Sequence, residues 1–249
     1  NRMPLVEIIP GKRTSPETIA TIVKLTKTLK KTPVVVQDCP GFLVNRILLP
    51  YVNEAVLCLQ DGASIEQIDA LVLKFGMPLG PLALADEVGL DVGYKVSKIL
   101  EAGYGDRMKI ADVFHDIYKD ETLRGKKTGQ GFYSHKKEGN TVNPHMNNLI
   151  KGHLTAQNCT DQDIIDRLIY IMVNEASRCI DEKVVENPGQ LDLAMIMGTG
   201  FPPFRGGLCR YADQVGIDIV SRRLSELSSK FGSRFKPSPY FEKGENFYK

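Results

Sequence analysis

The chain has 249 residues, a formal net charge of +2 and 42% hydrophobic residues, a composition typical of a globular protein with one large or two modest domains. Its Lys and Arg residues are interspersed with Asp and Glu, and the absence of a basic stripe with interleaved aromatics argues against nucleic-acid binding. The five cysteines contain no C-x-x-C pair and favour reduced thiols in a cytosol-like compartment. No apolar stretch predicts a transmembrane segment.

The first 36 residues predict a strand, a helix and a second strand. An apolar run over 3–9 reads as the first strand, Ser15 suits an N-cap, Pro16 suits the first helical position, and 32–36 read as the second strand. One such α/β unit is too small to bury its own sheet. We therefore expect it to be the tail of a larger domain, and the chain to be an excised fragment.

A turn on Pro40-Gly41 leads from the second strand into a long amphipathic helix that ends near Asp61. The first turn of this helix carries Asn45 beside Arg46. Strand-to-helix junctions are where α/β proteins meet their ligands, because helix N-termini offer free N–H groups and a positive dipole end. Asn45 is therefore a candidate ligand-binding residue, although an ordinary exposed Asn is the alternative.

The remaining chain is predominantly helical in pattern, with polar breaks. The predicted elements are a capping box at Ser64–Gln67, helices near 82–88, 91–102 and 108–119, a basic Gly-rich loop over 124–133, a polar stretch over 134–160 with weak periodicity, helices across 161–231, and an aromatic tail from Phe235 to Tyr248. These elements suggest a domain division into 1–37, 38–135, a linker over 136–160, and 161–249.

The helical part repeats itself. Arg46, the Asn53-Glu54-Ala55 triplet and Cys58 recur 121 residues later as Arg167, Asn174-Glu175-Ala176 and Cys179. Further landmarks follow in the same order, namely Ile68-Asp69 with Leu191-Asp192, Gly76-Met77-Pro78 with Gly200-Phe201-Pro202, and Val88-Gly89-Leu90-Asp91 with Val215-Gly216-Ile217-Asp218. This predicts a duplicated helical domain whose copies pack as a pseudo-twofold pair. Asn45 itself aligns with Asp166, which favours a ligand role confined to one copy.

Several other residues are candidates for chemistry. Glu7 is a carboxylate within an apolar strand; it either faces water at a strand edge or orients a histidine as in a base-plus-orienter pair. Lys126 and Lys127 are either solvated loop lysines or bind a phosphate or cofactor. The Gly198–Gly200 segment allows close backbone approach to a ligand or simply to another helix.

Other catalytic signatures are missing from the sequence. It contains no G-x-G-x-x-G after a strand, no P-loop and no G-x-S-x-G elbow. Its histidines lie in polar surroundings without metal-ligand spacing and read as solvated or incidental, so no metal site is predicted. The chain by itself cannot form a dinucleotide-binding fold.

A set of short motifs runs in order through nearly the whole chain. They are Met3-Pro4-Leu5-Val6-Glu7-Ile8-Ile9, Asp38-x-Pro40-Gly41-Phe42-x-x-Asn45-Arg46, Gly76-x-Pro78-x-Gly80-Pro81, Gly125-Lys126-Lys127-Thr128-Gly129-x-Gly131-Phe132-Tyr133, and Asn174-Glu175-Ala176 followed by Gly200-Phe201-Pro202-Pro203-Phe204-x-Gly206-Gly207. In these motifs the chain resembles the L-3-hydroxyacyl-CoA dehydrogenases, most closely the C-terminal part of the multifunctional α-subunits of fatty-acid β-oxidation, which join enoyl-CoA hydratase and dehydrogenase.

The resemblance implies a mainly α fold: a duplicated helical dehydrogenase C-terminal domain packed as a pseudo-dimer, preceded by a strand–helix–strand remnant of a Rossmann domain. It implies NAD as cofactor and oxidation of 3-hydroxyacyl-CoA to 3-oxoacyl-CoA. The family's general base is a His in an H-F-x-N-P motif upstream of the glutamate that matches Glu7. That His, the NAD-contacting Asn of the motif and the glycine fingerprint are absent here, so the fragment alone is expected to be inactive.

The family's remaining roles carry over to four residues. Glu7 would orient and polarise the histidine, and Asn45 would hydrogen-bond the substrate's 3-oxygen or thioester region. Lys127 matches a lysine that approaches the nicotinamide side of NAD. Met197 falls where some relatives place a substrate-lining aromatic, and this departure puts its role in doubt.

The implied partners are an acyl-CoA substrate, the missing NAD-binding and hydratase domains, and a thiolase subunit. The implied compartment is the bacterial cytoplasm or, in a eukaryote, the mitochondrial matrix or peroxisome. Two alternatives remain: a non-catalytic helical scaffold that docks β-oxidation subunits, and another dehydrogenase, acting on hydroxy acids, with a helical C-terminal half.

Overall fold

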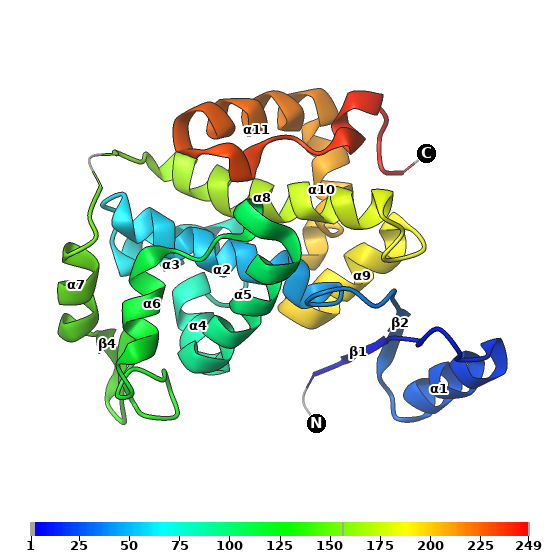
Figure 1. The fold of residues 1–249 in the computed structure, drawn as a ribbon, viewed down its shortest axis with the longest axis horizontal. Helices are drawn as coiled ribbons and strands as arrows, with labels where there is room; N and C mark the ends of the chain where they lie inside the picture. The colour runs from blue at the N-terminus through cyan, green and yellow to red at the C-terminus, as the bar shows by residue number, and fades with distance from the viewer. Residues whose placement is uncertain (1–2, 156, 249) are drawn as a thin grey trace. The chain divides into compact units, whose positions relative to one another are not determined.

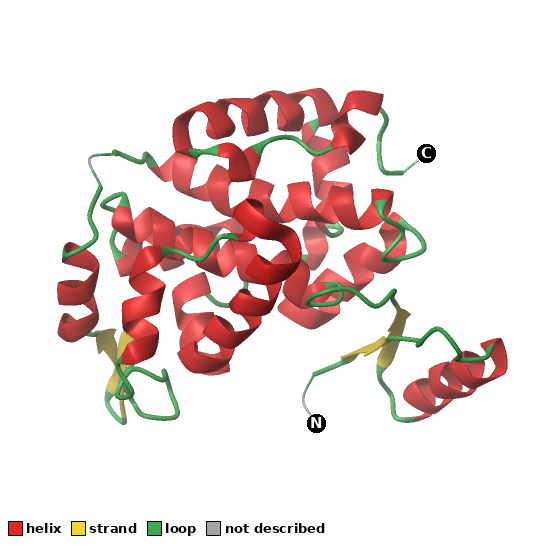
Figure 2. Cartoon of the chain, viewed as in Figure 1, coloured by secondary structure: helices red, strands yellow, loops and turns green. Residues whose placement is uncertain are grey.

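The computed structural model describes residues 3–155 and 157–248, which are mainly helical with two small sheets (Figure 2). The strands are β1 (Leu5–Ile8), β2 (Thr32–Val35), β3 (Tyr133–Lys136) and β4 (Gly139–Val142). The α-helices are α1 (Pro16–Thr28), α2 (Val44–Gln60), α3 (Ile65–Phe75), α4 (Pro81–Val88), α5 (Leu90–Tyr104), α6 (Asp112–Lys119), α7 (Pro144–Lys151), α8 (Asp161–Asp181), α9 (Pro188–Thr199), α10 (Leu208–Val215) and α11 (Ile217–Phe231). This confirms the mainly α fold.

The described chain divides into two compact units. Unit 1 contains Asn1–Leu48 and Met172–Lys249, and unit 2 contains Leu49–Ile171. The boundaries fall within helices α2 and α8, each of which therefore contributes one part to each unit. The domain limits expected from the sequence remain a prediction.

Unit 1 begins with the strand–helix–strand piece, drawn in blue in Figure 1. β1 and β2 pair in parallel, with Glu7 opposite Val34. As predicted, Ser15 caps α1: its hydroxyl accepts from the backbone N–H of Thr18 at 3.2 Å, and Pro16 follows at the first helical position. The segment after β2 continues onto the α8–α9 connection, where the N–H of Gln37 donates to the carbonyl of Val184 at 2.8 Å.

Helix α1 keeps much of its apolar face exposed to solvent. Ile22, Leu25 and Leu29 are 38%, 51% and 61% exposed, whereas Thr26 is buried. Parallel strands and their crossover helices are normally covered on both faces. The strand–helix–strand piece therefore leaves apolar surface of α1 exposed to solvent.

The rest of unit 1 is helical. It comprises the second part of α8 followed by α9, α10 and α11, with short 3₁₀ turns at Pro203–Arg205, Ser233–Phe235 and Pro239–Lys243. Its core includes Leu43, Ile47, Leu191, Met195, Phe201, Leu208, Val220, Leu224 and Phe235.

Unit 2 contains the larger part of α2, then α3 to α7 with the β3–β4 hairpin, and the first part of α8. The Ser64–Gln67 capping box opens α3 as predicted. The unit's core includes Tyr51, Ile65, Ile68, Val72, Leu82, Leu100, Phe114, Phe132, Met146, Ile164 and Leu168.

The predicted duplication is visible helix by helix. α4 and α10 each have 8 residues, and α5 and α11 each have 15. The glycine that separates each pair adopts nearly the same conformation, with φ 99° at Gly89 and 102° at Gly216. Asn53 donates to the carbonyl of Lys109 and accepts from the N–H of Ala111, at 3.0 and 2.9 Å, and Asn174 makes the equivalent pair of bonds after α11.

A buried aspartate opens the third helix of each repeat. Asp69 on α3 accepts from the backbone N–H groups of Leu82 and Ala83, at 3.0 and 3.1 Å, and from the hydroxyl of Tyr133 at 2.8 Å. These bonds satisfy donors that the start of a helix leaves without intrahelical partners. Burial raises the pKa of Asp69 despite these bonds.

Asp192 on α9 has the same role at α10. It accepts from the N–H groups of Cys209 and Arg210, at 2.7 and 3.0 Å, and from the hydroxyl of Tyr248 at 2.7 Å. Burial likewise raises the pKa of Asp192.

The polar stretch 134–160, which includes the linker expected over 136–160, contains regular secondary structure among its described residues. It contains most of the β3–β4 hairpin and helix α7, which Asn143 caps by accepting from the N–H of His145 at 3.0 Å. Strands of four residues and a helix of eight are shorter than the window in which periodicity is recognisable. No helix among the described residues is long and apolar enough to cross a membrane.

The two capping aspartates pack so closely against Gly80 and Gly207 that neither position has room for a side chain. A Cβ at Gly80 would lie 2.1 Å from Cγ of Asp69, and one at Gly207 would lie 2.3 Å from Cβ of Asp192. We expect Gly80→Ala and Gly207→Ala each to lower the free energy of unfolding by about 1–3 kcal/mol through overpacking. The loss should be larger at Gly207, whose φ of 108° adds backbone strain.

Urea unfolding followed by circular dichroism measures this difference. Gly93→Ala is the control, because Gly93 lies inside α5 and a Cβ there would have its nearest neighbour, in Phe114, at 3.9 Å. That variant should be neutral or slightly stabilising. Equal effects at all three positions would contradict the packing argument.

Candidate functional site

Glu7 caps the start of helix α2. Its Oε1 accepts from the backbone N–H of Leu43 at 2.8 Å and of Val44 at 3.3 Å, so a strand residue holds the helix turn that follows 36 positions later. Both bonds fall on Oε1, and within the described part of the chain Oε2 accepts none. Neither sequence interpretation of Glu7 included this cap.

Asn45 lies in the turn that Glu7 caps. The preceding residues Gly41 and Phe42 both have positive φ, 78° and 53°. The left-handed conformation is costly for a non-glycine residue and is concentrated at functional turns. Asn45 is exposed, whereas Arg46 beside it is fully buried. The turn therefore presents the amide to solvent while the neighbouring guanidinium anchors it.

Arg46 provides this anchor through two carboxylates of α8 and the residue after it. Its Nε lies 2.7 Å from Oε1 of Glu175, and its Nη1 lies 2.7 Å from Oε2 of Glu182. Burying a guanidinium is costly unless carboxylates remain in place around it. These contacts therefore fix the first turn of α2 against the second part of α8 within unit 1.

Met197 belongs to the same neighbourhood. It is half-buried on α9, and the next residue, Gly198, is so close to β1 and α2 that a Cβ on it would lie 2.9 Å from Leu5 and 3.2 Å from Val44. Leu5 and Val44 are near neighbours in the chain of Glu7 and Asn45 respectively. Unit 1 therefore brings three of the four predicted site residues into one region, and the glycine at 198 serves helix packing.

Lys127, the fourth predicted residue, lies in unit 2. It forms an ion pair with Asp91 at the start of α5, and Lys126 pairs with Glu87 on α4 at 2.5 Å. Both lysines are exposed. The pairing with Lys127 lowers the pKa of Asp91.

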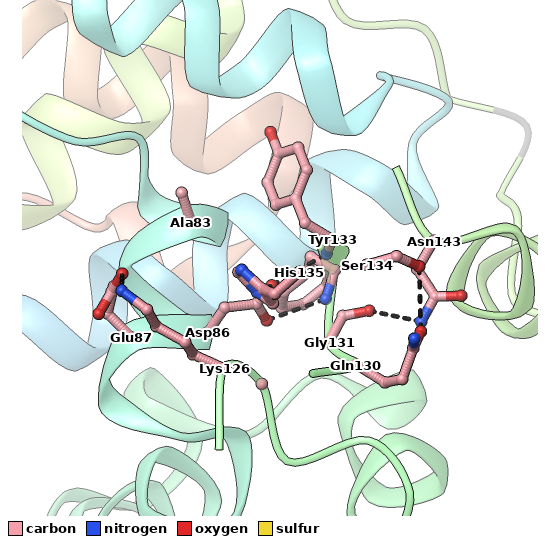
Figure 3. A network of polar contacts seen from close by, with 12 residues as sticks. Ala83, Asp86, Glu87, Lys126, Gln130, Gly131, Tyr133, Ser134, His135 and Asn143 are labelled. Carbon is pink, nitrogen blue, oxygen red and sulfur yellow. Dashed lines mark hydrogen bonds and ion pairs between the residues drawn. The ribbon is translucent and has the colours of Figure 1, made fainter. Parts of the chain in front are cut away.

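Asp86 organises the Gly-rich loop that carries these lysines (Figure 3). It is fully buried on α4; its carboxylate accepts from the N–H groups of Phe132 and Tyr133, both at 2.9 Å, and lies 2.9 Å from Nε2 of His135. A Cβ on Gly131 would lie 1.9 Å from the same carboxylate. Close packing over Asp86 therefore accounts for a glycine in this loop.

The second repeat contains an equivalent carboxylate that accepts two backbone hydrogen bonds. Asp213 on α10 accepts from the N–H groups of Phe247 and Tyr248, at 2.8 and 2.9 Å. The aromatic tail, which showed no periodicity in the sequence, thus docks as the Phe132–Tyr133 segment does in the first repeat. Because it occurs in both copies, we interpret this carboxylate arrangement as structural.

The histidines, interpreted from the sequence as solvated or incidental, each contact a polar side chain in the structure. His135, His145 and His153 each lie within 3.0 Å of an aspartate, and His115 bonds the hydroxyl of Tyr94 at 2.7 Å. These single partners indicate structural roles. No group of three or more His, Cys, Asp or Glu side chains suited to hold a metal occurs among the described residues.

The structure does not provide a dinucleotide cradle by itself. The turn from β1 to α1 contains one glycine, Gly11, which lacks the positive φ of a phosphate loop. The hydroxyl of Ser15 already satisfies a backbone donor at the start of α1, a position that bound phosphates occupy in dinucleotide folds. The described β1–α1 turn therefore does not form a phosphate-binding loop for a dinucleotide.

The cap by Glu7 predicts a specific pH dependence. Burial raises the pKa of Glu7 above 4.5, outweighing its two backbone hydrogen bonds. The folded state therefore binds this proton more tightly than the unfolded chain, which stabilises the fold below about pH 4.5; this contribution is lost as pH rises through the folded pKa. The stability of wild type relative to Glu7→Gln should increase as pH falls from 7 to 4.

Urea midpoints of both proteins across this pH range measure the effect. Glu17→Gln is the control: Glu17 is fully exposed in α1, and a hydrogen bond from its own backbone lowers its pKa, so the trend should reverse. A constant difference between wild type and Glu7→Gln would contradict the raised pKa.

Comparison with known proteins gives the following matches. The family described as 3-hydroxyacyl-CoA dehydrogenase, C-terminal domain, matches residues 41–135 and again 164–245. The family described as 3-hydroxyacyl-CoA dehydrogenase, NAD binding domain, matches residues 1–39. The two C-terminal-domain matches coincide with the two helical repeats.

Similar solved structures include the following three. 3-Hydroxybutyryl-CoA dehydrogenase from Escherichia coli K12 shares the fold, with a TM-score of 0.81 and 23% identity over 97% of this chain and 67% of that one. The dehydrogenase part of multifunctional enzyme 1 from C. elegans has a TM-score of 0.70 and 29% identity over 98% of this chain and 56% of that one. (S)-3-Hydroxybutyryl-CoA dehydrogenase from Ralstonia eutropha has a TM-score of 0.51 and 42% identity over 55% and 49%.

This chain thus spans from 49% to 67% of the length of these structures. The C-terminal-domain family covers more than half of its residues, in both repeats. The chain belongs to the 3-hydroxyacyl-CoA dehydrogenase family.

Proposed function

We propose that this chain forms the helical, substrate-side part of an NAD-dependent L-3-hydroxyacyl-CoA dehydrogenase of fatty-acid β-oxidation, which converts 3-hydroxyacyl-CoA and NAD⁺ to 3-oxoacyl-CoA and NADH. The observation that carries the proposal is the cap: Glu7 on β1 holds the helix turn that presents Asn45. A carboxylate and an exposed amide thus lie at the same strand-to-helix junction, the usual ligand position in α/β proteins.

Each site residue has a proposed role. Oε2 of Glu7 orients a histidine base, while Oε1 stays on the helix backbone. Asn45 hydrogen-bonds the substrate's 3-oxygen or thioester region and so positions the reacting carbon. Met197 lines the acyl side, and Lys127 approaches the nicotinamide side when it leaves Asp91. All hydride chemistry belongs to NAD.

We further propose that these residues alone are inactive. The H-F-x-N-P histidine and the glycine fingerprint do not occur in the sequence, and the exposed apolar face of α1 offers a surface on which further NAD-binding chain can pack. The second helical repeat and the similarity to a dehydrogenase part of a multifunctional enzyme support a parent protein with a hydratase domain and a thiolase partner.

The role of Asn45 can be tested in protein that also contains the NAD-binding segment. Asn45→Ala should lower kcat for NADH oxidation with acetoacetyl-CoA by ~10-fold or more, as expected for a hydrogen bond made in the transition state. Asn148→Ala, which removes an exposed helix amide in α7, is the matched control and should leave kcat unchanged. Unchanged kinetics in Asn45→Ala would remove Asn45 from the site.

Complementation tests the division of the enzyme. The 249-residue chain should fold by circular dichroism, show no turnover, and gain activity when the separately expressed NAD-binding segment is added. Turnover by the chain alone would mean that it contains an unrecognised base and cofactor site. No turnover with the added segment would favour the non-catalytic scaffold.

A further inference from the structure

A buried arginine contacts a cysteine in unit 2. Arg167 on α8 is fully buried, and its Nη1 lies 2.7 Å from Sγ of Cys159, in the loop before the helix. The same Nη1 lies 2.8 Å from Oδ2 of Asp61, and Nε lies 2.6 Å from Oε1 of Glu54. Cys159 is half-exposed, so reagents in solution can approach its sulfur.

A second cysteine lies along the same guanidinium. Glu54, Cys58 and Asp61 are spaced i, i+4 and i+7 and share one face at the end of α2. Arg167 bonds the first and last of them and therefore lies along this face, over the buried Cys58. The nitrogen of Arg167 that contacts Asp61 also contacts Sγ of Cys159, which brings the Cys159 thiol to the same guanidinium that lies along Cys58. Each of the two thiols affects the pKa of the other.

We propose that Cys159 and Cys58 form an oxidisable thiol pair in which Arg167 activates Cys159 toward hydroperoxides, and Cys58 closes a disulfide. The Cys159 thiolate attacks the O–O bond of hydrogen peroxide, forming a sulfenic acid and releasing hydroxide. The sulfur of Cys58 then attacks the sulfenic sulfur, the S–O bond breaks, and the departing hydroxide takes the Cys58 proton as water. The two sulfurs lose two electrons, and the peroxide is reduced to one water and one hydroxide; the hydroxide becomes a second water by taking up the proton that the Cys159 thiol released on ionising.

The electrostatics assign the two roles. The hydrogen bond from Cys58 and the charge of Arg167 lower the pKa of Cys159 to about 7, against the effects of burial and of Asp61. Burial raises the pKa of Cys58, with Glu54 and Cys159 adding to it and Arg167 opposing it. Thiolates are the nucleophiles and low-pKa exposed thiols are the oxidation-sensitive ones. Cys159 is therefore the attacking thiol, and Cys58 the resolving thiol.

Unit 1 contains a weaker version that serves as an internal comparison. Arg46 pairs with Glu175 and Glu182, its Nη1 lies 3.9 Å from Sγ of Cys39, and burial raises the pKa of the neighbouring Cys179. The longer contact provides less stabilisation of a thiolate. We expect Cys39 to oxidise more slowly than Cys159.

The test uses the reduced 249-residue chain. After exposure to hydrogen peroxide, quenching and alkylation under denaturing conditions, peptide mapping should show a disulfide between Cys58 and Cys159 that dithiothreitol reverses. Iodoacetamide labelling of native Cys159 should have its half-maximal rate near pH 7. Three outcomes would overturn the proposal. The labelling rate of Cys159 could rise only near pH 9, all five thiols could remain alkylatable after a treatment that oxidises free glutathione, or the disulfide could form between other cysteines.

Variants separate the two roles. Cys58→Ser should leave a Cys159 sulfenic acid that dimedone traps, and Cys159→Ser should leave Cys58 reduced. Cys209→Ser is the control, because Cys209 is buried on α10 in unit 1, and it should form the Cys58–Cys159 disulfide as wild type does. If a variant fails to fold, the wild-type peptide map still tests whether Cys58 and Cys159 form the disulfide. A Cys159→Ser variant that loses Cys58 at the wild-type rate would contradict the assignment.

Discussion

The fold depends on two buried guanidinium groups. Arg46 and Arg167 are both fully buried, and each bonds a glutamate and a second carboxylate within its own unit. Removing one partner from such a cluster typically costs about 3–5 kcal/mol, because the remaining charge stays buried. The charges must therefore be placed together, and the start of α2, with Asn45 on it, takes its position from that requirement.

Comparison of the two repeats distinguishes residues that the fold requires from residues that occur in one copy only. The residues that recur make the same contacts twice: the arginines, the asparagines that bond to the loop after the fourth helix, and the aspartates that open α4 and α10. Asn45 has no such recurrence, since the second copy has Asp166 there. Asn45 is also exposed, whereas Asp166 is buried. This contrast supports a role for Asn45 outside the packing of the repeat.

Much of the fold could be predicted from the sequence, because its signals are local. The Ser15 cap, Pro16, the Ser64–Gln67 capping box and the repeat each depend on residues a few positions apart or on direct self-similarity. The sequence allowed the residue types of the candidate site to be proposed, but not the contacts that position those residues. The bond from Glu7 to the start of α2 joins residues 36 positions apart, and Tyr248 reaches Asp192 across 56. The periodicity of apolar residues along the sequence cannot predict such long-range contacts.

Pro50 interrupts the backbone hydrogen-bond pattern of α2 one turn after Asn45. It lies inside α2 and has no N–H, so it cannot donate the helical hydrogen bond to the carbonyl of the residue four positions earlier. Within unit 1, the first turn of α2 is held by the Glu7 carboxylate and by the contact of Arg46 with Glu175 on α8. A proton on Glu7 weakens its two backbone hydrogen bonds but removes the larger cost of burying a charged carboxylate, so the fold as a whole is stabilised at low pH. The protonation state of Glu7 and the conformation of the turn that carries Asn45 are therefore linked through these backbone hydrogen bonds.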